Sequence, residues 1–104
     1  MQTTITARHC EIPDALRARA RTVVQRLGSL ARRPIETAVV FDTDGGRSRA
    51  ELRLYVARGE PLVASGEADD HRTALDRAEE KLRRQLDKAS PRSRRPRDAQ
   101  PKLG

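Results

Sequence analysis

The pattern that decides the fold lies in Ser48–Arg58, which reads SRAELRLYVAR. Every second position in its central part is apolar: Ala50, Leu52, Leu54 and Val56. Successive side chains of a strand point to opposite faces, so this stretch predicts a strand with one buried and one solvent-facing side. A sheet with one wet face is normal for antiparallel pairing, and we expect that arrangement here.

Further strands are predicted on both sides of this stretch. Glu36–Thr43 (ETAVVFDT) is rich in residues that favour strands, and Asp44–Gly46 supplies the hairpin turn that follows it. On the other side, Gly59–Pro61 turns the chain into a strand over Leu62–Ala68. Residues 2–8 alternate weakly and predict the first strand of the chain.

Two amphipathic helices complete the pattern. The first is expected from Asp14 to about Ala31, with apolar residues at steps of four, three, four and three: Leu16, Ala20, Val23, Leu27 and Leu30. The second is expected over Asp69–Lys88, with Asp69 or Asp70 as its cap and one apolar line: Ala74, Ala78, Leu82 and Leu86. The order β-α-β-β-β-α predicts an α+β two-layer sandwich, a four-stranded sheet with two helices on one face.

The charge of the chain points to an anionic partner. The net charge is +7 over 104 residues, which is the length of one small domain with a tail. Residues 1–88, the expected domain, hold 17 basic and 14 acidic residues, whereas residues 89–104 hold 5 basic and 1 acidic. The tail is rich in proline, serine and arginine without apolar periodicity, so we expect it to be disordered. Nucleic acid is the first candidate partner, an anionic membrane surface the second, and a merely soluble charged surface the alternative to both.

Residue types that would indicate an enzyme are sparse. The single cysteine, Cys10, excludes an intrachain disulfide, and neither it nor His9 or His71 belongs to a metal-binding motif. Asp69 and Asp70 are interpreted as a helix cap rather than a metal site. We therefore expect no enzyme activity, no cofactor, no metal and no small-molecule substrate. No apolar run could act as a signal or span a bilayer, so we expect a cytoplasmic protein without a membrane partner.

The second helix carries its cations in one line, which we call the basic stripe: Arg77, Lys81, Arg84 and Lys88. A row of cations at helical pitch suits a phosphate backbone. Ion pairs of Glu79 with Arg83 and of Glu80 with Arg84 are the structural alternative, and that alternative leaves Arg77 and Lys81 unexplained.

The first helix adds a second row of cations beside the basic stripe. One flank of this helix is expected to present Arg19, Arg26 and Arg33. Together the two helices would form a broad basic patch. The only aromatic residues are Phe41 and Tyr55, which argues for recognition of shape and backbone rather than base stacking.

Two blocks of sequence carry a resemblance to a known family. The first is the opening MQTTITARHCEIPDALR, and the second runs from Ala64–Asp70 (ASGEADD) through Ala74–Asp76 (ALD) to Glu80–Lys88 (EKLRRQLDK). Over residues 1–88 the chain resembles the ribosome hibernation promoting factor family in its short form (ribosome-associated translation inhibitor, sigma-54 modulation protein family). Unlike many members, it has His71 and Arg72 where an aromatic residue is common, Asp87 within the basic end of the helix, and an Arg/Pro-rich tail.

The resemblance implies a function as well as a fold. The family's fold has the same element order and is similar to double-stranded-RNA-binding domains. It implies binding to the small ribosomal subunit and its rRNA in the mRNA and tRNA channel, with silencing or stabilisation of idle ribosomes in stress or stationary phase. The family's RNA contacts carry over to Arg26, Lys81, Arg84 and Lys88, and Arg77 extends the same line. We expect no dedicated dimerisation domain of the kind that the family's long form has.

Two other functions remain as alternatives: a general double-stranded RNA-binding module and a protein-interaction regulator. A double-stranded-RNA module begins with a helix and places lysines at the start of its last helix. This chain is expected to begin with a strand and to start its last helix with Asp69 and Asp70, which repel phosphate. These features favour the ribosome-binding function.

Overall fold

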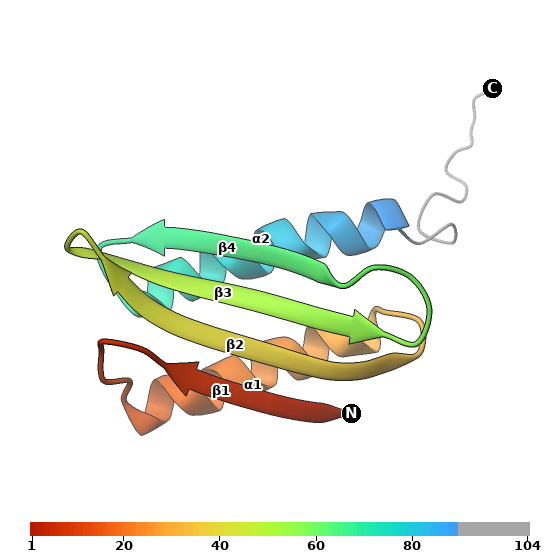
Figure 1. Ribbon diagram of the computed structural model, residues 1–104, viewed down its shortest axis with the longest axis horizontal. Coiled ribbons are helices and arrows are strands. Elements are labelled where there is room, and N and C mark those ends of the chain that lie inside the picture. The colour runs from red at the N-terminus through yellow and green to blue at the C-terminus, as the bar shows by residue number, and fades with distance from the viewer. Residues whose placement is uncertain (90–104) are drawn as a thin grey trace.

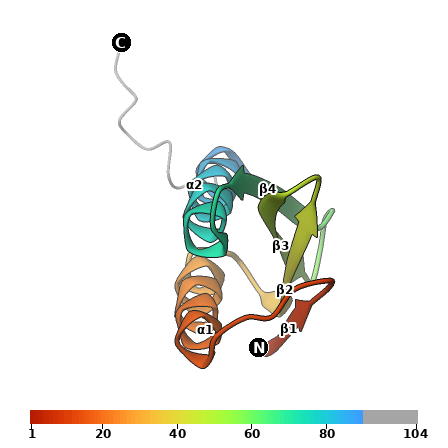
Figure 2. The ribbon, with the colours of Figure 1, turned by 90° about the vertical axis from the view of Figure 1, so that its left-hand side faces the viewer.

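The computed structural model describes residues 1–89 as a four-stranded sheet with both helices on one face (Figures 1 and 2). The elements in chain order are β1 (Gln2–Ala7), α1 (Asp14–Ser29), β2 (Pro34–Asp44), β3 (Arg47–Val56), β4 (Leu62–Ala68) and α2 (His71–Ala89). The predicted β-α-β-β-β-α order and α+β class are confirmed. Of the tail expected to be disordered, residues 89–104, only Ala89 is described, as the end of α2, and the rest lies outside the described residues.

The sheet has the strand order β1-β2-β3-β4, and its pairing is mixed. β2, β3 and β4 pair antiparallel, as expected, but β1 pairs parallel to β2, with Ile5 opposite Val39. The expectation of an antiparallel sheet is therefore wrong for β1. The reason is the connection: a helix, α1, carries the chain from the end of β1 back to the end at which β1 began, so β2 runs in the same direction.

The element boundaries differ from the predicted ones by a few residues. β4 has the predicted bounds, whereas β2 begins at Pro34, a position where a strand tolerates proline because the first residue need not donate to the ladder. α1 ends at Ser29 rather than Ala31. The β2–β3 hairpin turns through Gly45 and Gly46, whose φ angles of 59° and 79° lie in the region that glycine adopts without strain.

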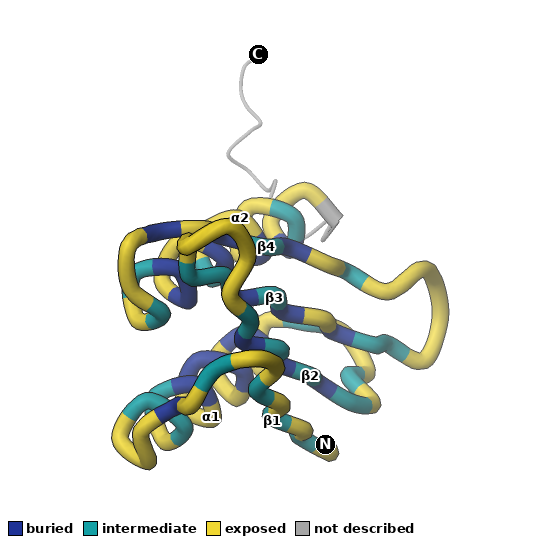
Figure 3. Tube along the Cα trace, turned by 60° about the vertical axis from the view of Figure 1, so that its left-hand side comes forward, coloured by how far each residue is buried: buried dark blue, intermediate teal, exposed yellow. Residues whose placement is uncertain are grey.

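The core lies between the sheet and the helices (Figure 3). On the sheet side, Val39 and Phe41 of β2 and Leu52 and Leu54 of β3 are fully buried. The helices contribute most of the predicted apolar residues, together with Val24 and Leu75, which the predicted lines omit. Two residues of the first predicted line differ: Leu16 is only partly buried, and Leu30, which follows the end of α1, is 48% exposed. The opposite face of the sheet stays open to solvent, as the alternation in β3 predicts. No helix among the described residues is long and apolar enough to cross a membrane.

Candidate nucleic-acid interface

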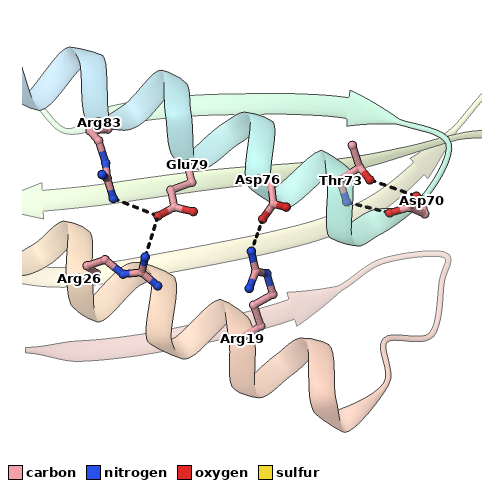
Figure 4. Close-up of polar contacts among 7 residues, drawn as sticks. All are labelled: Arg19, Arg26, Asp70, Thr73, Asp76, Glu79 and Arg83. Atoms are coloured by element: carbon pink, nitrogen blue, oxygen red, sulfur yellow. Dashed lines mark hydrogen bonds and ion pairs between the residues drawn. The ribbon is translucent and has the colours of Figure 1, made fainter.

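The two helices lie side by side and both start at the same end of the sheet, because β1, β2 and β4 all run in one direction (Figures 2 and 4). The cations predicted to contact RNA all lie on these two helices. The structure divides them into an outer group on α2 (Arg77, Lys81, Arg84 and Lys88) and the inter-helix cations of α1 (Arg19 and Arg26), which pair with carboxylates of α2. Arg33, expected on the same flank as Arg19, instead lies beyond the end of α1, with a φ of 52°.

Two members of the basic stripe are held by the edge of the sheet. Arg77 donates a hydrogen bond to the carbonyl oxygen of Glu67 at 2.7 Å, and Lys81 donates one to the carbonyl oxygen of Ser65 at 3.0 Å. Gln85 continues the series with a 2.8 Å bond to the carbonyl oxygen of Val63. These carbonyls belong to β4, an edge strand, and α2 therefore covers its outward acceptors.

The regularity of this series follows from the dimensions of a helix and a strand. Four residues of α-helix rise about 6 Å, and two residues of β-strand span about 6.6 Å. Each step of four residues along α2 therefore meets a step of two residues along β4. This contact explains Arg77 and Lys81 structurally, which the helix ion pairs considered from sequence did not. It does not exhaust their donors, since a guanidinium has five N–H groups and an ammonium has three.

The outer end of the basic stripe is more weakly held. Arg84 pairs with Glu80 at 3.1 Å, and both side chains are exposed, at 68% and 66%. An ion pair this exposed contributes about 0–1 kcal/mol, so Arg84 can exchange its carboxylate for another anion at little cost. Lys88 is exposed in the last turn of α2.

Carboxylates of α2 hold the inter-helix cations (Figure 4). Arg19 binds Asp76 at 2.7 Å, and this hydrogen bond, reinforced by the charge of Asp76, raises the pKa of Arg19 above its ordinary value. Glu79 lies between two arginines, with Arg83 at 3.2 Å and Arg26 at 3.8 Å. These residues therefore form an alternating row of charges that ties α1 to α2, rather than an uncompensated basic patch.

An acidic cap precedes α2, as predicted. Asp70 is the cap: its carboxylate accepts hydrogen bonds from the backbone N–H of Thr73 at 2.7 Å and from the Thr73 hydroxyl at 3.1 Å. The backbone bond, followed by the hydroxyl bond, lowers the pKa of Asp70.

His71 stands directly after this cap and has a packing role. Its Nε2 is 2.8 Å from the carbonyl oxygen of Asp42, and its ring meets Phe41 edge to face, with 5.8 Å between the ring centroids. The resemblance noted above implies an aromatic residue near this position. His71 stands there instead, and its ring packs on Phe41 of the sheet as an aromatic ring would.

Several cations of the described residues have no partner, and most of them are not among the predicted RNA contacts. Within residues 1–89, seven arginine side chains form no ion pair or hydrogen bond: Arg8, Arg17, Arg21, Arg32, Arg33, Arg58 and Arg72. Arg72 belongs to the helical face and lines an open hollow of about 360 Å³ with Arg19, Asp70 and His71. Helical position alone could have identified Arg72, since it precedes Asp76 and Glu79 on the same side of α2.

The described residues contain no group of three or more histidine, cysteine or acidic side chains that could hold a metal ion. The arrangement that the structure does offer is a pair of parallel helices with ordered cations, some anchored and some weakly paired. Such a face can bind a polyanion through its backbone.

The fold and the cations together define a small α+β domain with two basic helices on one face of its sheet. Comparison with known proteins identifies its family. The chain belongs to the Sigma 54 modulation protein / S30EA ribosomal protein family, whose model matches residues 3–94. No curated protein matches it by sequence.

Two solved structures share the fold. The first is a ribosomal subunit interface protein from Coxiella burnetii, with a TM-score of 0.74 and 20% identity over 86% of this chain and 97% of that one. The second is the N-terminal domain of Protein Y from Thermus thermophilus, with a TM-score of 0.71 and 26% identity over 84% of this chain and 96% of that one. At 20% identity the first similarity concerns the fold alone.

Proposed function

We propose that this protein is a ribosome-associated hibernation factor. It binds the small ribosomal subunit through its rRNA, in the channel used by mRNA and tRNA, and silences or stabilises idle ribosomes under stress or in stationary phase. The observation that carries the proposal is the match of residues 3–94 to the S30EA ribosomal protein family, which spans the whole helical face. The fold that the chain shares with the two solved structures agrees with it.

In this proposal the helical face meets the RNA backbone. Arg77 and Lys81 are held in place by the β4 carbonyls and keep spare donors, so little side-chain freedom is lost when they bind phosphate. Arg84 and Lys88 continue the line, and Arg84 exchanges Glu80 for phosphate. Binding then releases counterions and weakens as salt increases.

The inter-helix cations have a secondary part in this proposal. Arg19 and Arg26 hold α1 against α2 through Asp76 and Glu79, so they fix the spacing of the two helices. Arg19 and Arg26 reach RNA only by leaving or sharing these carboxylates. We therefore assign the main phosphate contacts to the basic stripe.

We also propose that the protein acts by binding in the cytoplasm and is not an enzyme, since its family is described as ribosomal. A general double-stranded RNA binder fits less well. The carboxylate of Asp70 occupies the N-terminus of α2, where a helix would otherwise attract phosphate.

The proposal is tested by sedimentation of the purified full chain with separated ribosomal subunits. We expect the protein to travel with small subunits at low salt and to dissociate between about 50 and 200 mM monovalent salt. Sedimentation with large subunits alone, or equal binding to an unrelated RNA duplex added as competitor, would contradict it.

A further inference from the structure

The two edge strands of the sheet differ in the hydrogen bonding of their outward backbone groups. At the β4 edge, side chains of α2 bind three successive outward carbonyls, those of Val63, Ser65 and Glu67. At the β1 edge, no side chain or backbone group within residues 1–89 forms a hydrogen bond to the outward side of the strand. Figure 1 shows β1 at the margin of the sheet, with no strand beyond it.

The outward groups of β1 can be assigned from the ladder. The N–H of Arg8 donates to the carbonyl oxygen of Phe41 at 2.8 Å, so the backbone of Arg8 faces β2. In a parallel ladder alternate residues face the same neighbour, which places the N–H and C=O groups of Thr3, Ile5 and Ala7 on the open side. The strand thus presents three donors and three acceptors to solvent.

β1 also lacks the features by which edge strands usually prevent pairing. Its six residues, QTTITA, include no charge and no proline, and its register with β2 has no bulge. Threonine and isoleucine favour strands. No residue of β1 is buried (Figure 3), so an incoming strand need displace nothing.

The charges around this edge indicate the kind of strand that fits. Arg8 follows β1 directly, and Arg17 and Arg21 lie on the flank of α1 opposite the one from which Arg19 reaches α2. These three arginine side chains have no partner within residues 1–89, and two carboxylates oppose them: Glu11 in the loop between β1 and α1, and Asp14 in the first turn of α1 on the flank of Arg17 and Arg21. A second copy pairing through β1 would bring a like set of arginines to the same place, whereas an acidic segment would neutralise them.

We propose that the β1 edge accepts an extended, acidic segment of a partner protein as a fifth strand of the sheet. The backbone groups of Thr3, Ile5 and Ala7 supply the hydrogen bonds, and Arg8, Arg17 and Arg21 select for acidic residues. The site is distinct from the helical face and does not depend on ribosome binding.

The test uses the full chain and two synthetic peptides, each an alternating valine–threonine strand flanked at both ends by two glutamates or by two lysines. NMR-detected hydrogen exchange is measured for the amides of β1 and β4. We expect the glutamate peptide to slow exchange at Thr3, Ile5 and Ala7 without affecting β4, and to bind about tenfold more tightly than the lysine peptide.

Two pairs of variants separate the contribution of the backbone hydrogen bonds to peptide binding from that of the arginine charges. Thr3→Pro removes an outward donor at a position where an edge strand tolerates proline, and it should abolish protection, whereas Thr3→Val keeps the N–H and should retain it. Arg17→Gln with Arg21→Gln should erase the preference for glutamate. The matched control, Arg32→Gln with Arg58→Gln, removes the same charge from loops outside β1 and α1 and should leave the preference intact.

Three results would overturn the proposal. The first is the absence of protection at β1 with either peptide, and the second is equal protection by both peptides. The third is protection that grows with protein concentration in the absence of peptide, together with sedimentation as a dimer, which would make a second copy the occupant.

Discussion

Gly66 of β4 lies directly against the backbone of α2 at Ala74. A Cβ atom added at Gly66 would come within 2.4 Å of the carbonyl oxygen of Ala74 and 2.8 Å of the backbone nitrogen of Ala78. Both atoms belong to helix backbone and cannot move aside without shifting the helix. The glycine in the ASGEADD block therefore sets how closely α2 approaches the sheet, and with it the contacts between the basic stripe and β4.

Gly66→Ala should destabilise the fold because α2 must move away from β4. Overpacking of this kind costs typically about 1–3 kcal/mol in the free energy of unfolding. Chemical denaturation of the variant measures it directly. The control is Ser65→Ala on the same strand, which adds no atoms and should stay within about 0.5 kcal/mol of the parent. A Gly66→Ala variant as stable as the parent would show that the helix does not pack this closely.

Lys81 offers a way to separate structure from charge. Lys81→Met keeps the aliphatic stem but removes the donor to the Ser65 carbonyl, and should lower the free energy of unfolding by about 0.5–1.5 kcal/mol. Lys81→Gln should keep that hydrogen bond, because Gln85 already makes the equivalent bond to Val63. Denaturation and exchange of the β4 amides distinguish the two variants. Equal stability of both would contradict a structural role for this contact.

Asp70 should make stability depend on pH in the acid range. Its pKa is lowered in the folded protein, so its contribution is complete above its ordinary pKa of 3.8 and is lost as the pH falls through the lower folded value. Asp70→Asn keeps an N-cap acceptor that does not titrate. The melting temperature of the parent should therefore fall relative to that of Asp70→Asn as the pH drops below about 4. A constant difference at every pH would exclude this role.

The fold could be predicted because the sequence alternates strongly where the sheet is half buried. β4 has its predicted bounds, since Pro61 before it and Asp69 after it are residues that strands avoid. The parallel pairing of β1 with β2 could not be read in the same way. A strand's alternation shows which face is buried, but it does not say which neighbour the strand has.

The candidate site was only partly predictable for a related reason. Helical spacing places Arg77 and Lys81 on one line and pairs Arg84 with Glu80, because these relations lie within one helix. Helical spacing cannot show that backbone carbonyls of β4 accept hydrogen bonds from Arg77 and Lys81. Nor can it show that Arg19 of α1 pairs with Asp76 of α2. Those contacts depend on how α2 is seated on β4 and beside α1.

The charge of the basic stripe can now be tested without disturbing the contacts to β4. The triple variant Arg77→Gln, Lys81→Gln and Arg84→Gln removes three positive charges while keeping side chains able to donate to the β4 carbonyls. Stability should change little. Affinity for small ribosomal subunits should fall, and the dependence of log affinity on log salt should become shallower by roughly two to three units, about one for each phosphate that the variant no longer neutralises.

The matched control removes three charges from the other side of the molecule: Arg47→Gln, Arg49→Gln and Arg53→Gln. Arg47 pairs with Asp69, Arg49 with Asp44 and Glu67, and Arg53 with Glu51. All three arginines lie away from the outer surfaces of both helices. Because the net charge of the two variants is the same, a general electrostatic attraction would weaken both equally. A direct contact by the helical face weakens only the stripe variant, and binding measured over a salt series decides between them. Equal losses in affinity and slope would mean that the RNA-binding face is not the helical one.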